Sequence, residues 1–214
     1  MNDVSSLLKR MWVVLAVLLV LRTVIVVFAS YQDYLPPNFD SAFLAGRESY
    51  FFGFYRWPFY LHITSGPCSL LIGLVLLNNQ LRTARPALHR VLGNLQCVCV
   101  IGVVAPSGLS MSWHSDGGAA AGTAFALLAV LTALTAAIGW REAVRRRFVS
   151  HRRWMWRNFV LLCSAVVLRV IGGTQQVAGI ESEWGYPTAA WVCWLLPLLI
   201  LESIEHRNQV RIGK

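Results

Sequence analysis

Six apolar runs separated by polar segments dominate the chain. A helix rises about 1.5 Å per residue and the apolar core of a bilayer is about 30 Å thick, so each run has the length of one membrane-spanning helix. The pattern predicts an all-α, polytopic integral membrane protein with six transmembrane helices in one domain over residues 1–214. The expected spans are about 11–29, 59–79, 91–113, 119–140, 154–172 and 189–204.

The polar segments between the runs differ in length and character. Residues 31–57 form the longest one, rich in aromatic residues, and we expect an outer loop that includes a short interfacial helix over residues 42–50. Pro106 lies within the third run and predicts a kink there. The fourth run carries a stripe of small residues that permits close helix packing. The members of this stripe are Gly118, Gly122, Ala126, Ala129, Ala133 and Ala137.

Composition supports insertion in a bilayer. Of the 214 residues, 56% are hydrophobic and only 14% are charged, whereas about a quarter of the residues of a soluble domain are charged. The net charge of +9 does not indicate a nucleic-acid partner, because the cations lie in the gaps between apolar runs and form no continuous basic helix.

The cations also predict an orientation. Fifteen of the nineteen Lys and Arg residues fall in the segments on one side of the predicted layout, and only Arg47 and Arg56 fall on the other. Because cytoplasmic loops are enriched in Lys and Arg, both termini are expected in the cytoplasm, with the chain in the cell membrane.

Several kinds of chemistry are disfavoured by the motifs. The five cysteines lie in apolar runs, and the absence of a Cys-x-x-Cys-His sequence excludes covalent attachment of a c-type haem. Neither Gly-x-Ser-x-Gly nor His-Glu-x-x-His occurs, so a hydrolase is not indicated.

The histidines fall into two layers of the predicted bundle. His89 and His151 begin the third and fifth spans at the inner face, whereas His62 and His114 lie at the outer face. A b-type haem is held without covalent bonds by imidazoles from facing helices. The spacing therefore predicts haem b with His89 and His151 as iron ligands, and a second haem held by His62 and His114. Histidines at membrane borders also simply bond to headgroups or carbonyls, and this alternative stays open.

Two arginines interrupt apolar runs. Arg22 lies in the first span and Arg169 near the outer end of the fifth. A cation within a bilayer requires an anionic partner or reaches the interface by extending its side chain. For Arg169 the candidate partners are a haem propionate, Asp116, Glu181, a lipid phosphate or a bound substrate.

The order of motifs from Tyr60 to Arg169 resembles the bacterial predicted membrane proteins grouped as domain of unknown function 2306. The motifs that carry the resemblance are Leu61-His62 with Gly66 and Gly73, Leu88-His89-Arg90 with Gly93, the segment Gly117 to Gly122, the segment His151 to Arg157, and Leu168-Arg169. The resemblance implies a multi-pass protein of the bacterial inner membrane and fixes no activity.

The helix and histidine layout of that family is similar to the two-haem transmembrane b-type cytochromes. There the cytoplasmic-side haem is held from the third and fifth helices, which correspond to His89 and His151. The outer pair departs from the pattern, because His114 precedes the fourth helix.

Three functional hypotheses follow. The leading one is a haem-containing electron carrier or transmembrane oxidoreductase that takes electrons from a quinol or a soluble donor. The second is a cofactor-free membrane subunit or assembly factor with a membrane-protein partner. The third is a transporter of a small anionic substrate, which the absence of an evident inverted repeat weakens.

Overall fold

The computed structural model contains the helices that the apolar pattern predicts. It describes residues 2–41, 43–180 and 182–212, and within these ranges the side chains of residues 2–6, 9, 208, 211 and 212 are left out. The described residues form helices and loops, and six helical segments are long and apolar enough to cross a membrane. These are Arg10–Asp33, Glu48–Leu76, Pro86–Ser112, Gly118–Val144, Phe148–Val177 and Gly185–Arg207.

The chain divides into two compact units, residues 1–54 and 55–214. The first unit contains α1 (Asn2–Ala29), the 3₁₀ turn η1 (Ser30–Asp33) and α2 (Glu48–Tyr50). Aromatic contacts consolidate its loop, in which the Phe39 ring lies 5.4 Å from that of Phe51. The helix expected over residues 42–50 is only the single turn of α2, and position 42 lies outside the described residues.

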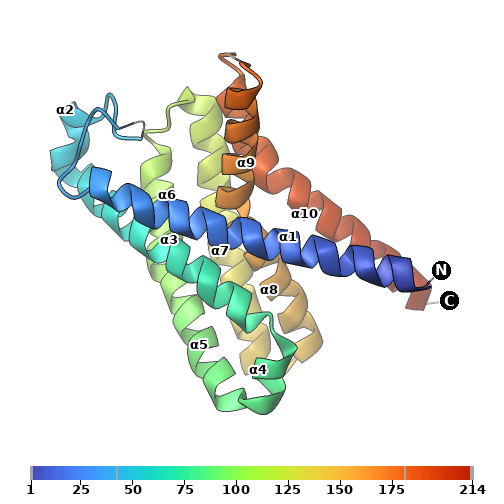
Figure 1. Cartoon of the computed structure of the whole chain (residues 1–214). Coiled ribbons are helices and arrows are strands. Elements are labelled where there is room, and N and C mark those ends of the chain that lie inside the picture. Colours follow the sequence, from blue (N-terminus) through green and yellow to red (C-terminus); the bar gives the residue numbers. More distant parts are fainter. Residues whose placement is uncertain (1, 42, 181, 213–214) are drawn as a thin grey trace. The chain divides into compact units, whose positions relative to one another are not determined.

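The second unit is a helical bundle, and Figure 1 shows the course of its helices. The main packing partners are α7 with α8, α6 with α7 and α3, and α10 with α7 and α9. The helices of this unit and their bounds are α3 (Arg56–Leu76), α4 (Asn79–Ala84), α5 (Pro86–Cys99), α6 (Ala105–Ser112), α7 (Gly118–Val144), α8 (Phe148–Leu162), α9 (Ser164–Val177) and α10 (Gly185–Ile212).

Two predicted spans are irregular inside the membrane. In the third, a π-helical turn over Val100–Val104 separates α5 from α6 and directly precedes Ala105 and Pro106, as expected where a proline cannot donate a backbone hydrogen bond. The fifth span breaks at Cys163, between α8 and α9. His151 on α8 and Arg169 on α9 therefore do not lie on one regular helix.

Small residues on α7 let neighbouring backbones approach, although the buried face is not the predicted stripe. Ala129 is buried, but Gly118 and Ala137 are exposed. A methyl group added at Gly122 would lie 2.8 Å from the backbone oxygen of Ser112 on α6. One added at Gly139 would lie 2.7 Å from the Met155 sulfur on α8. The close approach of α6 to α7 therefore depends on glycine at position 122, whereas a side chain at position 139 would displace the flexible Met155 side chain.

This packing predicts opposite effects for two glycine substitutions. Gly122→Ala should destabilise the bundle by about 1–3 kcal/mol, because the clash is with backbone and a helix must shift. Gly66→Ala on α3 should be neutral or stabilising by about 0.5–1 kcal/mol, since no described atom lies within 4 Å of the added methyl group. Thermal unfolding in detergent compares the two variants. Equal melting temperatures would contradict the close α6–α7 contact.

Candidate functional site

A cavity of about 610 Å³ opens at the end of the bundle that carries the α3–α4 and α7–α8 loops. Its walls come from the last turn of α3, from α4 and α5, from the last turns of α7, and from α8. Most ligand pockets in proteins have volumes of about 300–1,000 Å³. His89 and His151, the two histidines predicted at the inner face, both line this cavity.

The same local structure places the two histidines. Pro86 begins α5 and Phe148 begins α8, so each histidine is the fourth residue of its helix and lies within the first turn. The backbone N–H of His89 donates to the Arg85 carbonyl at 3.1 Å, and that of His151 donates to the Arg147 carbonyl at 2.9 Å. Two helices that begin at one level thus present two imidazoles to one cavity.

His151 is held in one tautomer. Its Nδ1 lies 2.8 Å from the backbone oxygen of Gly139 on α7. A carbonyl oxygen only accepts hydrogen bonds, so Nδ1 carries the proton and donates it, and neutral His151 keeps a lone pair on Nε2. An imidazole fixed in this way by a backbone carbonyl is the usual arrangement of a histidine that binds a metal.

His89 is less constrained by the protein. Its Nδ1 is buried and has no hydrogen-bond partner among the described residues. Buried polar nitrogen atoms are rarely left unpaired. The side chain therefore has hydrogen-bonding or ligating capacity that the described part of the bundle does not use.

Arginines from three helices line the same cavity. They are Arg82 on α4, Arg90 on α5 and Arg152 on α8, and all three are exposed. Arg82 Nη2 donates to Asn79 Oδ1 at 3.4 Å. Among the described residues, no Asp or Glu lines the cavity. Its mouth is therefore cationic and suited to a carboxylate or phosphate group.

Two amide side chains lie deeper in the cavity. Gln96 is seven residues after His89 on α5, and Asn158 is seven residues after His151 on α8. Seven residues are about two helical turns, so both amides lie about 10 Å further along the helices than the histidines. Gln96 Nε2 donates to the Ser69 carbonyl at 3.0 Å, and Asn158 Nδ2 donates to the Thr132 carbonyl at 2.8 Å. We call Gln96 and Asn158 the deep amide pair.

The cavity does not contain the donor set of a structural metal site. Among the described residues, no group of three or more His, Cys, Asp or Glu side chains is arranged to hold a metal ion. A tetrahedral zinc site needs four ligands, usually all from the protein. A haem iron takes four of its ligands from the porphyrin and needs only one or two from the protein, so two histidines are compatible with it.

The outer histidines make separate contacts. His62 Nδ1 lies 3.2 Å from the Val104 carbonyl oxygen and 3.1 Å from Ser107 Oγ. The His114 ring lies in the loop after α6 and meets the Tyr55 ring edge-on at 5.0 Å. His62 thus contacts α6 seven residues before His114, an offset of about 10 Å along that helix. The structure does not place these two imidazoles in one layer as it does the inner pair.

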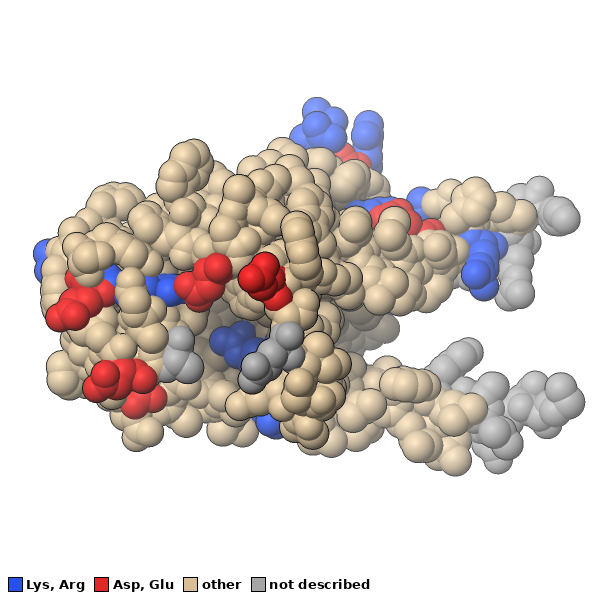
Figure 2. Space-filling model, turned by 90° about the horizontal axis from the view of Figure 1, so that it is seen from above, with Lys and Arg blue, Asp and Glu red and all other residues tan. Residues whose placement is uncertain are grey.

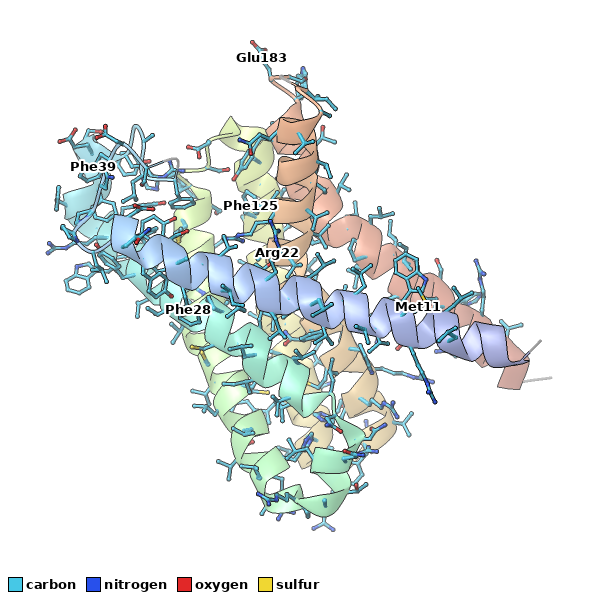
Figure 3. The ribbon with its side chains drawn as sticks, in the orientation of Figure 1. Met11, Arg22, Phe28, Phe39, Phe125 and Glu183 are labelled. Carbon is cyan, nitrogen blue, oxygen red and sulfur yellow. The ribbon has the colours of Figure 1, made fainter. Side chains whose placement is uncertain are left out.

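Arg22 and Arg169, which interrupt apolar runs of the sequence, are both exposed. Arg169 Nη1 donates to the Ala165 carbonyl of its own helix at 3.0 Å. Arg22 is exposed on α1, between Met11 and Phe28 in Figure 3. Of the anionic partners considered for Arg169, Glu181 lies outside the described residues.

The α6–α7 and α9–α10 loops, at the end of the bundle opposite the cavity, are acidic. Asp116 lies in the α6–α7 loop and Glu183 in the α9–α10 loop, and neither loop contains Lys or Arg. Figure 2 looks onto this end and shows acidic side chains there, and Figure 3 shows Glu183 at the tip of the α9–α10 loop. This contrast with the arginine-lined cavity mouth at the opposite end follows the charge asymmetry of the sequence.

One ionic cluster was not foreseen from the sequence. Arg157 on α8 donates through Nη2 to Glu202 Oε2 and to Glu205 Oε2 on α10, each at 2.8 Å, and its guanidinium lies 5.0 Å from the centre of the Trp154 ring. The sequence feature that indicates this cluster is the placement of Glu202 and Glu205, three residues apart, near the end of the last apolar run. The side chains of Arg157 and Glu205 are each only 17% exposed, so the cluster joins α8 to α10.

Comparison with known proteins identifies a family of membrane proteins. A family model described as "Predicted membrane protein (DUF2306)" matches residues 59–204, more than half of the chain. No curated protein matches the chain, and no solved structure matches it. The matched region contains the cavity and the four histidines discussed above.

Proposed function

The chain belongs to the DUF2306 family of predicted membrane proteins, and we propose that it is a b-type haem protein that carries electrons at the arginine-rich end of the bundle. The observation that supports this proposal is that His89 and His151 line one cavity. The proposal concerns one haem, because His89 and His151 line one cavity, whereas His62 and His114 make separate contacts.

The ligand set follows from the tautomers. His151 would bind the iron through Nε2, since Nδ1 donates to the Gly139 carbonyl. His89 would supply a second nitrogen ligand from α5. A haem held there would supply one-electron chemistry through its ferric and ferrous states.

The remaining walls suit a porphyrin. Apolar and aromatic side chains from α3, α7 and α8 line the cavity, and the arginines lie on helices that meet at its mouth. A porphyrin is a flat apolar ring with two carboxylates on one edge. Arg82, Arg90 and Arg152 would pair with these propionates, and the ring would extend into the apolar part between the helices. Leu76, Leu77, Trp140, Phe148 and Phe159 are among the apolar residues.

The location of the haem constrains its electron donor. The positive-inside rule predicts that the arginine-rich end faces the cytoplasm. The family resemblance implies that the membrane is a bacterial inner membrane. A single haem at that surface would exchange electrons with a quinol in the bilayer or with a soluble protein at the cytoplasmic face.

The test is the absorption spectrum of the protein purified from haem-replete cells. We expect a Soret band that shifts on addition of dithionite, at a stoichiometry near one haem per chain. Two haems per chain would require the outer histidines, His62 and His114, as well. A colourless protein would overturn the proposal. The arginines would then be interpreted as the binding site of a small anionic ligand in a transporter, or as part of a cofactor-free subunit.

A further inference from the structure

The turn between α7 and α8 consists of three arginines. Arg145, Arg146 and Arg147 follow Val144, the last residue of α7, and precede Phe148, the first residue of α8. All three arginines are exposed, and none of them lines the cavity. We call these three residues the arginine turn. Its cations are separate from those assigned to the proposed haem.

Arg146 adopts a conformation that glycine normally takes. Its N–H donates to the Ala143 carbonyl and that of Arg147 donates to the Glu142 carbonyl, each at 2.9 Å, which is the pattern that ends many helices with glycine in the left-handed conformation. The φ of Arg146 is 57°, and a side chain in this region costs conformational free energy. The other described residues with positive φ are Gly46, Gly118 and Gly179. An arginine at such a position indicates a role for its guanidinium.

The charge around the turn is not balanced by the protein. Glu142 is 5% exposed, and its carboxylate lies 3.5 Å from Arg141 Nη2 and 3.9 Å from Arg147 Nη1. Arg145 and Arg146 have no ionic partner among the described residues. One carboxylate therefore serves two arginines, and two further guanidiniums are available to an anion from outside the described chain.

The location of the turn matches that of a lipid headgroup. The turn joins two segments that are long and apolar enough to span a membrane, Gly118–Val144 and Phe148–Val177. Three residues reach at most about 10 Å, so the turn stays close to the ends of both spans, where headgroup phosphates lie. Val149, in the first turn of α8, is 72% exposed and does not line the cavity. An exposed apolar side chain next to exposed guanidiniums fits a phospholipid, which presents acyl chains beside a phosphate, better than a soluble anion.

We propose that the arginine turn binds the phosphate of an anionic phospholipid, and that Arg146 distinguishes this lipid from a zwitterionic one. A guanidinium donates two parallel hydrogen bonds to phosphate oxygens. Phosphatidylglycerol keeps a net negative charge on its headgroup, whereas the choline of phosphatidylcholine neutralises its phosphate. The positive-inside rule predicts the turn at the cytoplasmic leaflet, which is rich in anionic lipid. This binding is independent of the haem proposal.

Thermal unfolding of the purified full-length chain in detergent micelles tests the selectivity. Short-chain phosphatidylglycerol, short-chain phosphatidylcholine and inorganic phosphate are each titrated at the same ionic strength, and the rise in melting temperature with concentration gives the affinity. We expect phosphatidylglycerol to bind at least about fivefold more tightly than phosphatidylcholine. Equal affinities for the two lipids would overturn the proposal. Inorganic phosphate that stabilises as much as phosphatidylglycerol would also overturn it, because the ligand would then be a soluble anion.

Arg146→Gly should affect stability and lipid binding in opposite directions. In phosphatidylcholine the melting temperature should rise by about 2–4 °C, because glycine adopts the left-handed conformation without a steric cost. The affinity for phosphatidylglycerol should fall about fivefold, the effect expected for one arginine at a membrane surface. A variant with unchanged affinity for phosphatidylglycerol would overturn the role of Arg146.

Two control variants separate the guanidinium from net charge and from the backbone. Arg207→Gln also removes one cation, from an exposed position of α10 outside the cavity lining, and should change the affinity for phosphatidylglycerol little. An equal loss in Arg207→Gln and Arg146→Gly would show diffuse attraction and overturn the site. Arg146→Asn removes the guanidinium but keeps a residue that tolerates the left-handed conformation, so it should lose the same factor of about five. Wild-type affinity in Arg146→Asn would overturn the assignment.

Discussion

His151→Ala is expected to abolish stable haem binding, with loss of the Soret band from protein that still inserts and folds. The variant removes Nε2, the proposed ligand, which is the unprotonated nitrogen because Nδ1 donates its proton to the Gly139 carbonyl at 2.8 Å. Changing only the residues behind a metal ligand lowers affinity about 10–100-fold, so removing the ligand should cost more than about 100-fold. His89→Ala should have the same effect. Haem content per chain, measured on the monodisperse fraction, checks both.

The matched control for these variants is His206→Ala. His206 is exposed near the end of α10 and does not line the cavity, so this variant should retain full haem content. His62→Ala tests the outer layer in the same assay. Haem content that falls with His62 and persists without His151 would reject the inner cavity as the binding site.

Arg157→Met is expected to cause the largest loss of stability among single substitutions on α8. It leaves Glu202 and Glu205 facing each other without their shared cation, and Glu205 is mostly buried. Removing one partner of a buried ion pair costs about 3–5 kcal/mol, and the partial exposure of Glu202 places the expected loss near the lower end, about 3 kcal/mol. Thermal unfolding in detergent should show a melting temperature lower by roughly 10 °C.

Two further variants show whether the ionic cluster causes the expected loss of stability. Arg153→Met, one turn earlier at an exposed position, should change the melting temperature little, as for most surface charges. The triple variant Arg157→Met, Glu202→Gln, Glu205→Gln should recover much of the lost stability, because no charge is then left unpaired. A triple variant no more stable than Arg157→Met would show that the guanidinium acts through its packing on Trp154 instead.

The transmembrane architecture could be predicted from the sequence because a bilayer imposes a length on each apolar run. All six expected spans overlap helical segments of the structure. Breaks inside the spans were harder to place. Pro106 predicts the irregularity before α6. Cys163 is neither proline nor glycine, so the end of α8 there depends on tertiary packing that a single sequence does not reveal.

The candidate site was only partly accessible to sequence reasoning. Depth along a helix can be counted, which is why His89 and His151 were assigned to one layer. The fit of His151 to the Gly139 carbonyl depends on how α7 and α8 pack, which no spacing encodes. The deep amide pair was missed because uncharged polar residues inside apolar runs usually serve only helix packing. The sequence feature that could have indicated it is a shared spacing, because Gln96 follows His89 and Asn158 follows His151 by seven residues each.

Gly139 has a consequence for how mechanical stress in the bilayer would reach the imidazole. The absence of a side chain at Gly139 lets Met155 of α8 approach α7, and the Gly139 carbonyl oxygen accepts a hydrogen bond from His151 Nδ1. Lateral separation of the two helices would lengthen this hydrogen bond and free the ring to rotate or exchange tautomers. A change in the spacing of α7 and α8 is therefore expected to change which nitrogen of His151 carries the proton.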